Sequence, residues 1–409
     1  MKPETMESHQ VFRGYKYEVD PNNKQKTIFL KHAGCARFTY NWGLEQRIKR
    51  FQEKEGSERF TTAMEQHRAL VRLKQSRFKW MYEVSKCAPQ EALRDLEQAF
   101  KYFWQRRKAG RKSGFPRFKK KGTNERFRLY GRIKVFEKEV QLPRIGKVRL
   151  KEQPKIEGQI VSVTISRKAN RWFVSFRVKQ KRLLPPPVDG PTIGVDLGLR
   201  NLATLSDGKV FKNPRPLSQR LRKLRRLSKI ISRRKRGSKN WWKAIIQLAT
   251  LHWRIRNIKQ DALHKLTTYL AKNHSRIVIE NLNVTGMLRN RTLARAISEV
   301  GFYEFRRQLE YKTRWNGSEL IIAPLFHPSS KICSQCGAIK QKFPSNIQIY
   351  QCAECGLKID RDINAAQNLV AASWAETQNA CGADIRPKLS GQTAMNQEPN
   401  TTNSSEYAG

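Results

Sequence analysis

Thr192-Ile193-Gly194-Val195-Asp196-Leu197-Gly198 is the stretch of this 409-residue chain that most narrows its fold. A short apolar run of this kind predicts a buried strand, and Asp196 stands where that strand ends. A second run, Arg276-Ile277-Val278-Ile279, is followed directly by Glu280. Because ligands bind at the carboxyl ends of strands in open α/β sheets, we expect both carboxylates at one rim of a sheet.

A third acidic residue, Asp362, precedes the helical run Ile363–Leu369. Three carboxylates at one rim would repel one another unless cations lay between them, and Mg²⁺ is the first choice for oxygen ligands. Two such ions about 3.5–4 Å apart can clamp the attacking and leaving oxygens of a phosphodiester. Taken singly, each acid could instead be a turn or cap residue, and Asp362 could be the N-cap of the last helix.

Four cysteines form two pairs with the spacing C-x2-C-x15-C-x2-C: Cys333, Cys336, Cys352 and Cys355. Each C-x-x-C turn aims two thiolates at one point, and two such turns complete a tetrahedral sulfur site for Zn²⁺. With all four positions filled by cysteine, the ion is expected to be structural. The remaining cysteines, Cys35, Cys87 and Cys381, are interpreted as packing or tail residues.

The chain is strongly basic, with 82 Lys and Arg against 34 Asp and Glu, a formal net charge of +48. The mutual repulsion of so many positive charges argues against an enzyme for small neutral metabolites and favours a polyanionic partner. Nucleic acid is a better candidate for this partner than an anionic membrane surface. Between Asp207 and Asp261 there are 18 basic residues and no acidic one. The nucleic-acid-binding candidates in this stretch are Arg222, Lys223, Arg225, Arg226, Arg233, Arg234, Lys235 and Arg236.

The pattern of residues also divides the chain. Val11–Val19 predicts a strand, residues 25–110 are helical, and period-2 runs in residues 111–182 predict a small antiparallel sheet or barrel. A proline-rich linker at residues 184–187 then leads into alternating strands and helices, which indicate an α/β domain. We expect no membrane span and no signal peptide, and the cysteine usage favours a reducing cytoplasm.

Several motifs together resemble the TnpB family of transposon-encoded, RNA-guided nucleases related to type V CRISPR effectors. The resemblance covers about residues 11–372 and rests on the Asp196 and cysteine motifs above and on Tyr15–Asn22, Gly114–Lys119, Ile279–Met287 and Asp360–Ala366. It implies that Asp196, Glu280 and Asp362 bind two Mg²⁺ ions as the catalytic triad, and that Asp362 rather than Asp360 is the ligand. It also implies one structural Zn²⁺.

The resemblance implies a multidomain α+β fold: a split β-barrel wedge domain with an inserted helical recognition domain, then an RNase H-like (RuvC) α/β nuclease domain carrying the zinc ribbon. The expected parts are residues 1–22 and 111–184 (wedge barrel), 23–110 (recognition domain), 185–327 (nuclease), 328–358 (zinc ribbon), 359–372 (last nuclease motif and helix) and 373–409 (disordered tail).

The function implied is RNA-guided cleavage of double-stranded DNA, with a guide RNA from the transposon end and a short motif beside the target. Two alternatives stay open: a nuclease-silent RNA-guided repressor and a DNA-joining transposase, which would use the same metals. A CRISPR-associated effector similar to TnpB is the alternative nearest to this hypothesis. The expected location is the prokaryotic cytoplasm, in association with the nucleoid.

Overall fold

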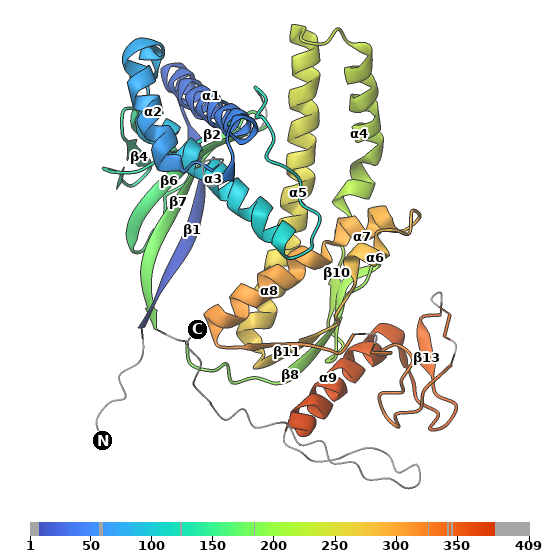
Figure 1. Ribbon diagram of the computed structural model, residues 1–409. Helices are drawn as coiled ribbons and strands as arrows, with labels where there is room; N and C mark the ends of the chain where they lie inside the picture. Colours follow the sequence, from blue (N-terminus) through green and yellow to red (C-terminus); the bar gives the residue numbers. More distant parts are fainter. Residues whose placement is uncertain are drawn as a thin grey trace, which may run out of the picture. The chain divides into compact units, whose positions relative to one another are not determined.

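The computed structural model describes residues 8–56, 60–122, 125–183, 185–325, 327–341, 343–344 and 347–380. The chain divides into two compact units. The first draws on Met1–Pro186 and Pro214–Lys265, and the second on Pro187–Asn213 and Leu266–Gly409. Helix α5 (Lys239–Asn273) contributes residues to both units. Figure 1 gives the labels of the elements.

The helices of the first unit follow its opening strand, as the sequence predicts. They are β1 (Ser8–Asp20), α1 (Asn23–Glu53), α2 (Ala63–Ser76), the 3-10 helix η2 (Lys79–Glu83) and α3 (Cys87–Lys108). A capping box starts α1, in which the Asn22 side chain accepts from the Gln25 N–H and the Gln25 side chain accepts from the Asn22 N–H. These bonds satisfy two N–H groups that the first helical turn leaves free.

The antiparallel sheet of the first unit has the strand order β2-β6-β7-β1-β5-β4-β3. Its further strands are β2 (Arg126–Leu129), β3 (Lys134–Val135), β4 (Glu139–Leu142), β5 (Gly146–Leu150), β6 (Gln159–Lys168) and β7 (Arg171–Leu183). The predicted antiparallel sheet is confirmed, but the predicted closed barrel is wrong for the described strands, because the sheet ends at β2 and β3 without joining them.

Helices cover the apolar face of this sheet, which explains why the sheet does not need to close on itself. Phe29 of α1 is fully buried, and its ring lies 5.9 Å from that of Phe127 and 5.0 Å from that of Trp172. Residues of α3, among them Ala92 and Leu96, belong to the same core. Figure 1 shows α1 and α3 on one side of the strands.

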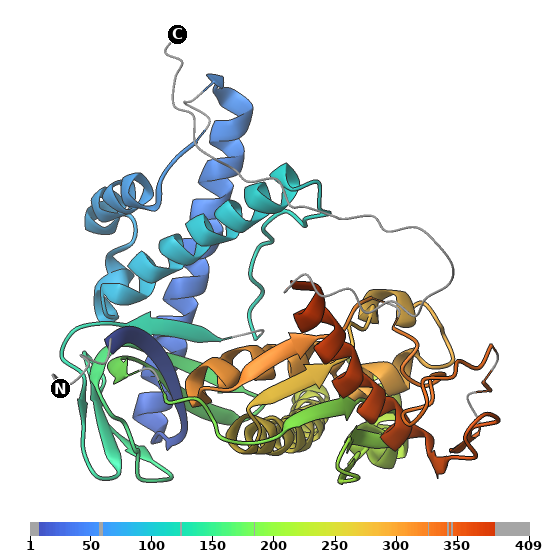
Figure 2. The same ribbon diagram turned by 90° about the horizontal axis from the view of Figure 1, so that it is seen from below.

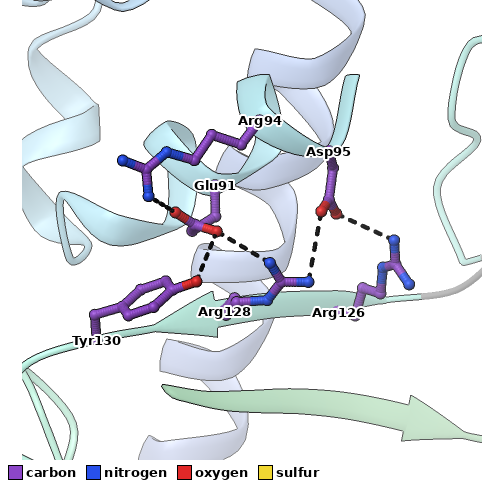
Figure 3. A network of polar contacts seen from close by, with 6 residues as sticks. All are labelled: Glu91, Arg94, Asp95, Arg126, Arg128 and Tyr130. Carbon is purple, nitrogen blue, oxygen red and sulfur yellow. Dashed lines mark hydrogen bonds and ion pairs between the residues drawn. The ribbon is translucent and has the colours of Figure 1, made fainter. Parts of the chain in front are cut away.

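An ionic network around one buried carboxylate, that of Glu91, connects α3 to β2 (Figure 3). Its members are Glu91, Arg94, Asp95, Arg126, Arg128 and Tyr130. Glu91 is only 4% exposed, and its carboxylate accepts from Arg94 at 2.7 Å, Arg128 at 3.1 Å and the Tyr130 hydroxyl at 3.2 Å. The network offsets the cost of burying this carboxylate, because each of its oxygens has a donor.

Helices α4 (Pro216–Arg233) and α5 run side by side (Figure 1). Leu224 and Leu227 of α4 pack against Leu251 of α5 in a small core of their own. The ring of Trp253 lies 6.2 Å from that of Phe173 in β7, which ties this part of α5 to the sheet. Residues 214–265 group with the first unit, although the expected nuclease range, residues 185–327, includes them.

A mixed five-stranded sheet with the order β10-β9-β8-β11-β12 forms the centre of the second unit. Its strands are β8 (Thr192–Asp196), β9 (Asn201–Leu205), β10 (Val210–Lys212), β11 (Arg276–Ile279) and β12 (Glu319–Ile322). Strands β8, β11 and β12 are parallel. The helices are α6 (Val284–Met287), α7 (Ala294–Val300), α8 (Phe302–Asn316) and α9 (Arg361–Ala380). Figure 2 shows α9 crossing one face of the sheet.

The remaining elements are the short antiparallel pair β13 (Ile349–Gln351) and β14 (Lys358–Asp360), which leads directly into α9. Helix α9 continues to Ala380, so the first eight residues of the expected tail are helical, and residues 381–409 lie outside the described part of the chain. Within the described residues, no helix combines the length and the apolar character needed to cross a membrane.

The network around Glu91 gives a stability prediction. Glu91→Gln keeps the shape of the side chain but removes the carboxylate that pairs with Arg94 and leaves Arg128 with Asp95 alone, at 3.5 Å, so the free energy of unfolding of the first unit should fall by about 2 kcal/mol. Denaturant unfolding would measure this loss. The matched control is Glu139→Gln, because Glu139 pairs with Lys147 at 3.7 Å on the exposed surface. That change should cost less than about 0.5 kcal/mol, and equal losses in both variants would contradict the assignment.

Candidate functional site

A backbone-to-backbone contact between β8 and α9 builds the site. A Cβ atom added at Gly194 would lie 1.9 Å from the carbonyl oxygen of Ala366, so any other residue would push the helix away. Ala365 and Ala366 are buried at the contact. Asp196 lies two residues after Gly194 and Asp362 one helical turn before Ala366, so the close approach brings the two carboxylates to the same end of β8.

Strand pairing places the second carboxylate beside the first. Strands β8 and β11 run parallel with Val195 opposite Ile279. The next residues along the two chains are Asp196 and Glu280, which therefore leave neighbouring strands at the same level. This is the arrangement that the sequence predicts for a carboxylate after each buried parallel strand.

Asp360, not Asp362, caps the last helix. The Asp360 Oδ1 atom accepts from the backbone N–H groups of Asp362 at 2.9 Å and Ile363 at 3.2 Å. These bonds satisfy the free N–H groups at the start of α9, which is the task of an N-cap residue. The capping alternative for Asp362 is therefore wrong, and its carboxylate stands in the first turn of the helix.

The three carboxylates interact electrostatically. Burial raises the pKa of Asp196 well above its ordinary value, and the charges of Glu280 and Asp362 raise it further, while Arg361 opposes the shift. Burial and Asp360 raise the pKa of Asp362, against Arg361 and Arg200. Such a raised pKa is typical of acids gathered where a cation can replace the proton.

The four cysteines converge as predicted. Their sulfur atoms all lie within 4.8 Å of one another, and Cys333–Cys355 and Cys336–Cys352 are each 3.6 Å apart. A tetrahedral site with Zn–S bonds of about 2.3 Å would separate the sulfurs by about 3.8 Å, so the cluster fits this ion. Gly337 and Gly356 have φ of 77° and 73°. Such left-handed backbone conformations, which the tight turns require, favour glycine.

Among the described residues, this cysteine cluster is the one group of three or more potential ligands with so tight a spacing. The carboxylates of Asp196, Glu280 and Asp362 are near enough to affect one another but do not form such a cluster. Ligands of two ions about 3.5–4 Å apart can stand farther apart than ligands of one. The wider spacing is therefore compatible with a pair of cations.

The basic candidates occupy the outer face of α4 and the turn that follows. All eight are exposed: Arg222, Lys223, Arg225, Arg226, Arg233, Arg234, Lys235 and Arg236. The leucines of the opposite face, Leu224 and Leu227, are buried against α5. Because no acidic residue occurs between Asp207 and Asp261, every charged side chain of this stretch is positive.

The structure adds three residues that the sequence analysis did not assign. Ser329 donates from its hydroxyl to Glu280 Oε1 at 2.7 Å. Asn364 and Asn368 are buried and hold the backbone of the segment around Cys333. Their spacing of four residues puts both asparagines on one face of α9, and polar residues on an otherwise apolar helical face were a signal for them. Nothing in the sequence marks Ser329.

The raised pKa of Asp196 has a consequence for stability. An acid whose pKa is higher in the folded than in the unfolded state destabilises the folded state as pH rises through the folded pKa. Asp196→Asn removes this cost, so the metal-free variant should melt about 2–4 °C higher than the wild type at neutral pH. Added Mg²⁺ should narrow the difference by stabilising the wild type more. Differential scanning calorimetry measures both effects.

The control for this comparison is Asp207→Asn in a surface turn, where Oδ1 accepts from the Lys209 N–H at 2.9 Å and an asparagine can keep the bond. Its melting temperature should match the wild type. A metal-free Asp196→Asn protein that melts lower than the wild type would contradict the repulsion among the carboxylates.

The cysteine cluster predicts one bound zinc ion per chain, because four thiolates complete a tetrahedral site. Cys352→Ser should lower the zinc content measured by elemental analysis, and should increase amide hydrogen exchange around β13 and β14. Cys87→Ser is the control, since Cys87 is half-buried in the first unit and outside the cluster. Full zinc content in Cys352→Ser would contradict the assignment.

Comparison with known proteins gives three family matches. They are described as "Probable transposase" for residues 175–291, "Cas12f1-like, TNB domain" for residues 302–369 and "Helix-turn-helix domain" for residues 6–56. In this chain the described part of residues 6–56 forms one strand, β1, and one long helix, α1, rather than two helices joined by a turn.

Relatives match almost the whole chain. A protein from Streptomyces pristinaespiralis, named "Putative RNA-guided DNA endonuclease", is 35% identical over 95% of this chain and 97% of its own. One from Escherichia coli K12 with the same name and the suffix InsQ is 31% identical over the same shares. A solved Cas12f1–sgRNA–target DNA complex has a similar fold, with a TM-score of 0.51 at 13% identity, covering 88% of this chain and 98% of the other. The chain belongs to the TnpB family.

Proposed function

We propose that this protein is an RNA-guided DNA endonuclease that cleaves target DNA by metal-assisted hydrolysis of phosphodiester bonds. The observation that carries the proposal is the convergence of Asp196, Glu280 and Asp362 at the end of β8 and β11. The names of the full-length relatives support the reaction, and the formal net charge of +48 supports two nucleic-acid partners.

The three acids would hold two divalent cations, with Mg²⁺ as the expected ion. Bound there, the ions would supply Lewis-acid stabilisation of charge on the attacking and leaving oxygens. The residues of this chain orient the carboxylates: Asp196 at a strand end, Glu280 through the Ser329 hydroxyl, and Asp362 in a helix whose start Asp360 fixes. Burial of Asp196 strengthens its attraction for a cation, because water screens the interaction less.

Residues 185–327 would then form the RuvC-like nuclease domain of RNase H-like fold, whose sheet belongs to the second unit, with the four-cysteine zinc ribbon inserted before α9. The sheet and helices α1–α3 of the first unit would be the wedge and recognition domains. The sheet replaces the expected barrel. This division of residues 1–372 into domains is our prediction, supported by the order of elements along the chain.

The guide RNA and the target duplex are the proposed partners, with a guide from the transposon end and a short target-adjacent motif read in the duplex. The exposed basic face of α4, from Arg222 to Arg236, would lie along a phosphate backbone. Each phosphate neutralised on duplex DNA should contribute about −0.9 to the log–log salt slope of binding. Both relatives named above are from bacteria, which supports action in the cytoplasm, at the nucleoid.

Two alternatives have less support. A nuclease-silent repressor has no need for the three carboxylates, whose mutual repulsion costs stability in the absence of cations. A DNA-joining transposase would use the same carboxylates, but the full-length relatives are named as endonucleases. Strand-transfer products in a plasmid assay would favour the transposase, and target binding without cleavage would favour the repressor.

The carboxylates provide the direct test. Asp196→Ala, Glu280→Gln and Asp362→Ala should each lower plasmid cleavage with Mg²⁺ and co-purified RNA by about a hundred-fold or more, because each weakens cation binding worth several kcal/mol in the transition state. RNA and target binding should persist in electrophoretic shift assays. Asp207→Asn should cleave like the wild type.

Normal cleavage by the Glu280→Gln protein would remove the two-metal assignment. Sequencing of the co-purified RNA tests the guide separately. A defined structured RNA that ends in a variable segment is expected, and random cellular RNA would contradict RNA guidance.

A further inference from the structure

Two buried asparagines of α9 hold the segment that leads into the cysteine cluster. Asn364 is fully buried, accepts from the Ser334 N–H at 2.9 Å and donates to the Ile332 carbonyl at 2.7 Å. Asn364 therefore hydrogen-bonds to the backbone on both sides of Cys333. Asn368, 3% exposed, donates from Nδ2 to the carbonyl oxygens of Ile332 and Ser329, both at 2.7 Å.

The same segment reaches a carboxylate of the proposed nuclease site. Ser329, held at its carbonyl by Asn368, is 3% exposed and donates its hydroxyl hydrogen to Glu280 Oε1 at 2.7 Å. A hydrogen bond of this kind to a charged acceptor restricts rotation of the carboxylate and fixes which oxygen can face a ligand. The segment 329–334 thus connects Cys333 at one end with Glu280 at the other.

The helix provides the second connection. Asp362 lies on α9 two residues before Asn364, so the asparagines that hold the cysteine-bearing segment stand on the same rigid element as a second carboxylate. Helix α9 itself is fixed on β8 by the Gly194–Ala366 contact. Two of the three acids are therefore positioned relative to one segment of the cysteine cluster.

We propose that Ser329 is a positioning residue for Glu280, and that Asn364 and Asn368 couple the four-cysteine site to the carboxylate site through the segment 329–334. This inference rests on the cation-binding role proposed above for the acids. Groups that orient metal-binding carboxylates affect metal affinity strongly although they do not touch the ion, typically by about 10–100-fold when they are replaced.

A purely structural role for these residues predicts something different. If Ser329 and the asparagines only held the ribbon together, replacing them would reduce zinc content or melting temperature and leave the affinity of the intact protein for a second cation unchanged. A positioning role predicts the reverse, with an effect on cation affinity and little effect on zinc content or stability. In the Ser329 variants, affinity for the cation at the carboxylates should fall while zinc content and melting temperature stay near those of the wild type.

The experiment compares Mn²⁺ binding to the full-length zinc-loaded protein by isothermal titration calorimetry in the wild type, Ser329→Ala and Ser329→Thr. The alanine variant should bind Mn²⁺ about ten-fold more weakly. The threonine variant, which keeps a hydroxyl group, should recover most of the affinity. Ser330→Ala removes the neighbouring hydroxyl instead and should bind like the wild type. Zinc content and melting temperature are measured on every sample.

Two further arms complete the test. Asn368→Ala should weaken Mn²⁺ binding in the same direction. In cleavage assays, Ser329→Ala should raise the Mg²⁺ concentration for half-maximal rate about ten-fold and regain a near-normal rate at saturating Mg²⁺. Equal Mn²⁺ affinity in the wild type and Ser329→Ala, or an equal loss in Ser330→Ala, would overturn the inference.

The same measurements distinguish a failure of the proposed function from a failure of this inference. If Asp196→Asn abolishes Mn²⁺ binding and the Ser329 series behaves as expected but the wild-type complex cuts no DNA, the endonuclease is wrong and the coupling stands. If Asp196→Asn leaves Mn²⁺ binding unchanged, the carboxylates hold no cation, and both are overturned.

Discussion

The close approach of α9 to β8 at Gly194 is the contact on which the second unit depends. The helix backbone replaces the side chain that any other residue would place there, with the Ala366 carbonyl where a Cβ would stand. This brings Asp362 to the end of a strand that already carries Asp196, beside Glu280 on the parallel neighbour. It also fixes the face of α9 on which Asn364 and Asn368 meet the ribbon. The Gly194–Ala366 contact therefore determines both how α9 packs on the sheet and where the carboxylates lie.

Repulsion between like charges marks both proposed binding sites, negative at the carboxylates and positive on α4. Burial, and then the charges of Glu280 and Asp362, raise the pKa of Asp196, and the face of α4 gathers positive charge without an acidic residue in the sequence between Asp207 and Asp261. Each arrangement costs the isolated protein stability, and a cation or a phosphate backbone would relieve that cost. This is the physical reason for interpreting both as binding sites rather than as solvated surface.

Features that depend on local spacing could be predicted from the sequence, and features that depend on distant packing could not. The cysteine cluster follows from motif spacing, and the apolar run before Asp196 or Glu280 predicts that each acid stands at a strand end. The convergence of the acids depends on the distant pairing of β8 with β11 and on the Gly194–Ala366 contact. The open sheet could not be foreseen, because it depends on Phe29 of α1 covering the face of β2 and β7. The cap at Asp360 and the Ser329–Glu280 bond depend on where the ribbon leaves the chain relative to β11.

The position of the ribbon in the chain explains why coupling between its site and the carboxylates is physically reasonable. Strand β14 ends at Asp360, the residue that caps α9, and pairs with β13, where Asp360 lies opposite Ile349. The Arg361 N–H donates to the Gln348 carbonyl at 2.7 Å, so the ribbon hairpin fixes the residue at which the helix starts. A one-residue shift of that start would rotate Asp362 by about 100° around the helix axis. A correctly folded ribbon is therefore a condition for aiming the Asp362 carboxylate toward Asp196.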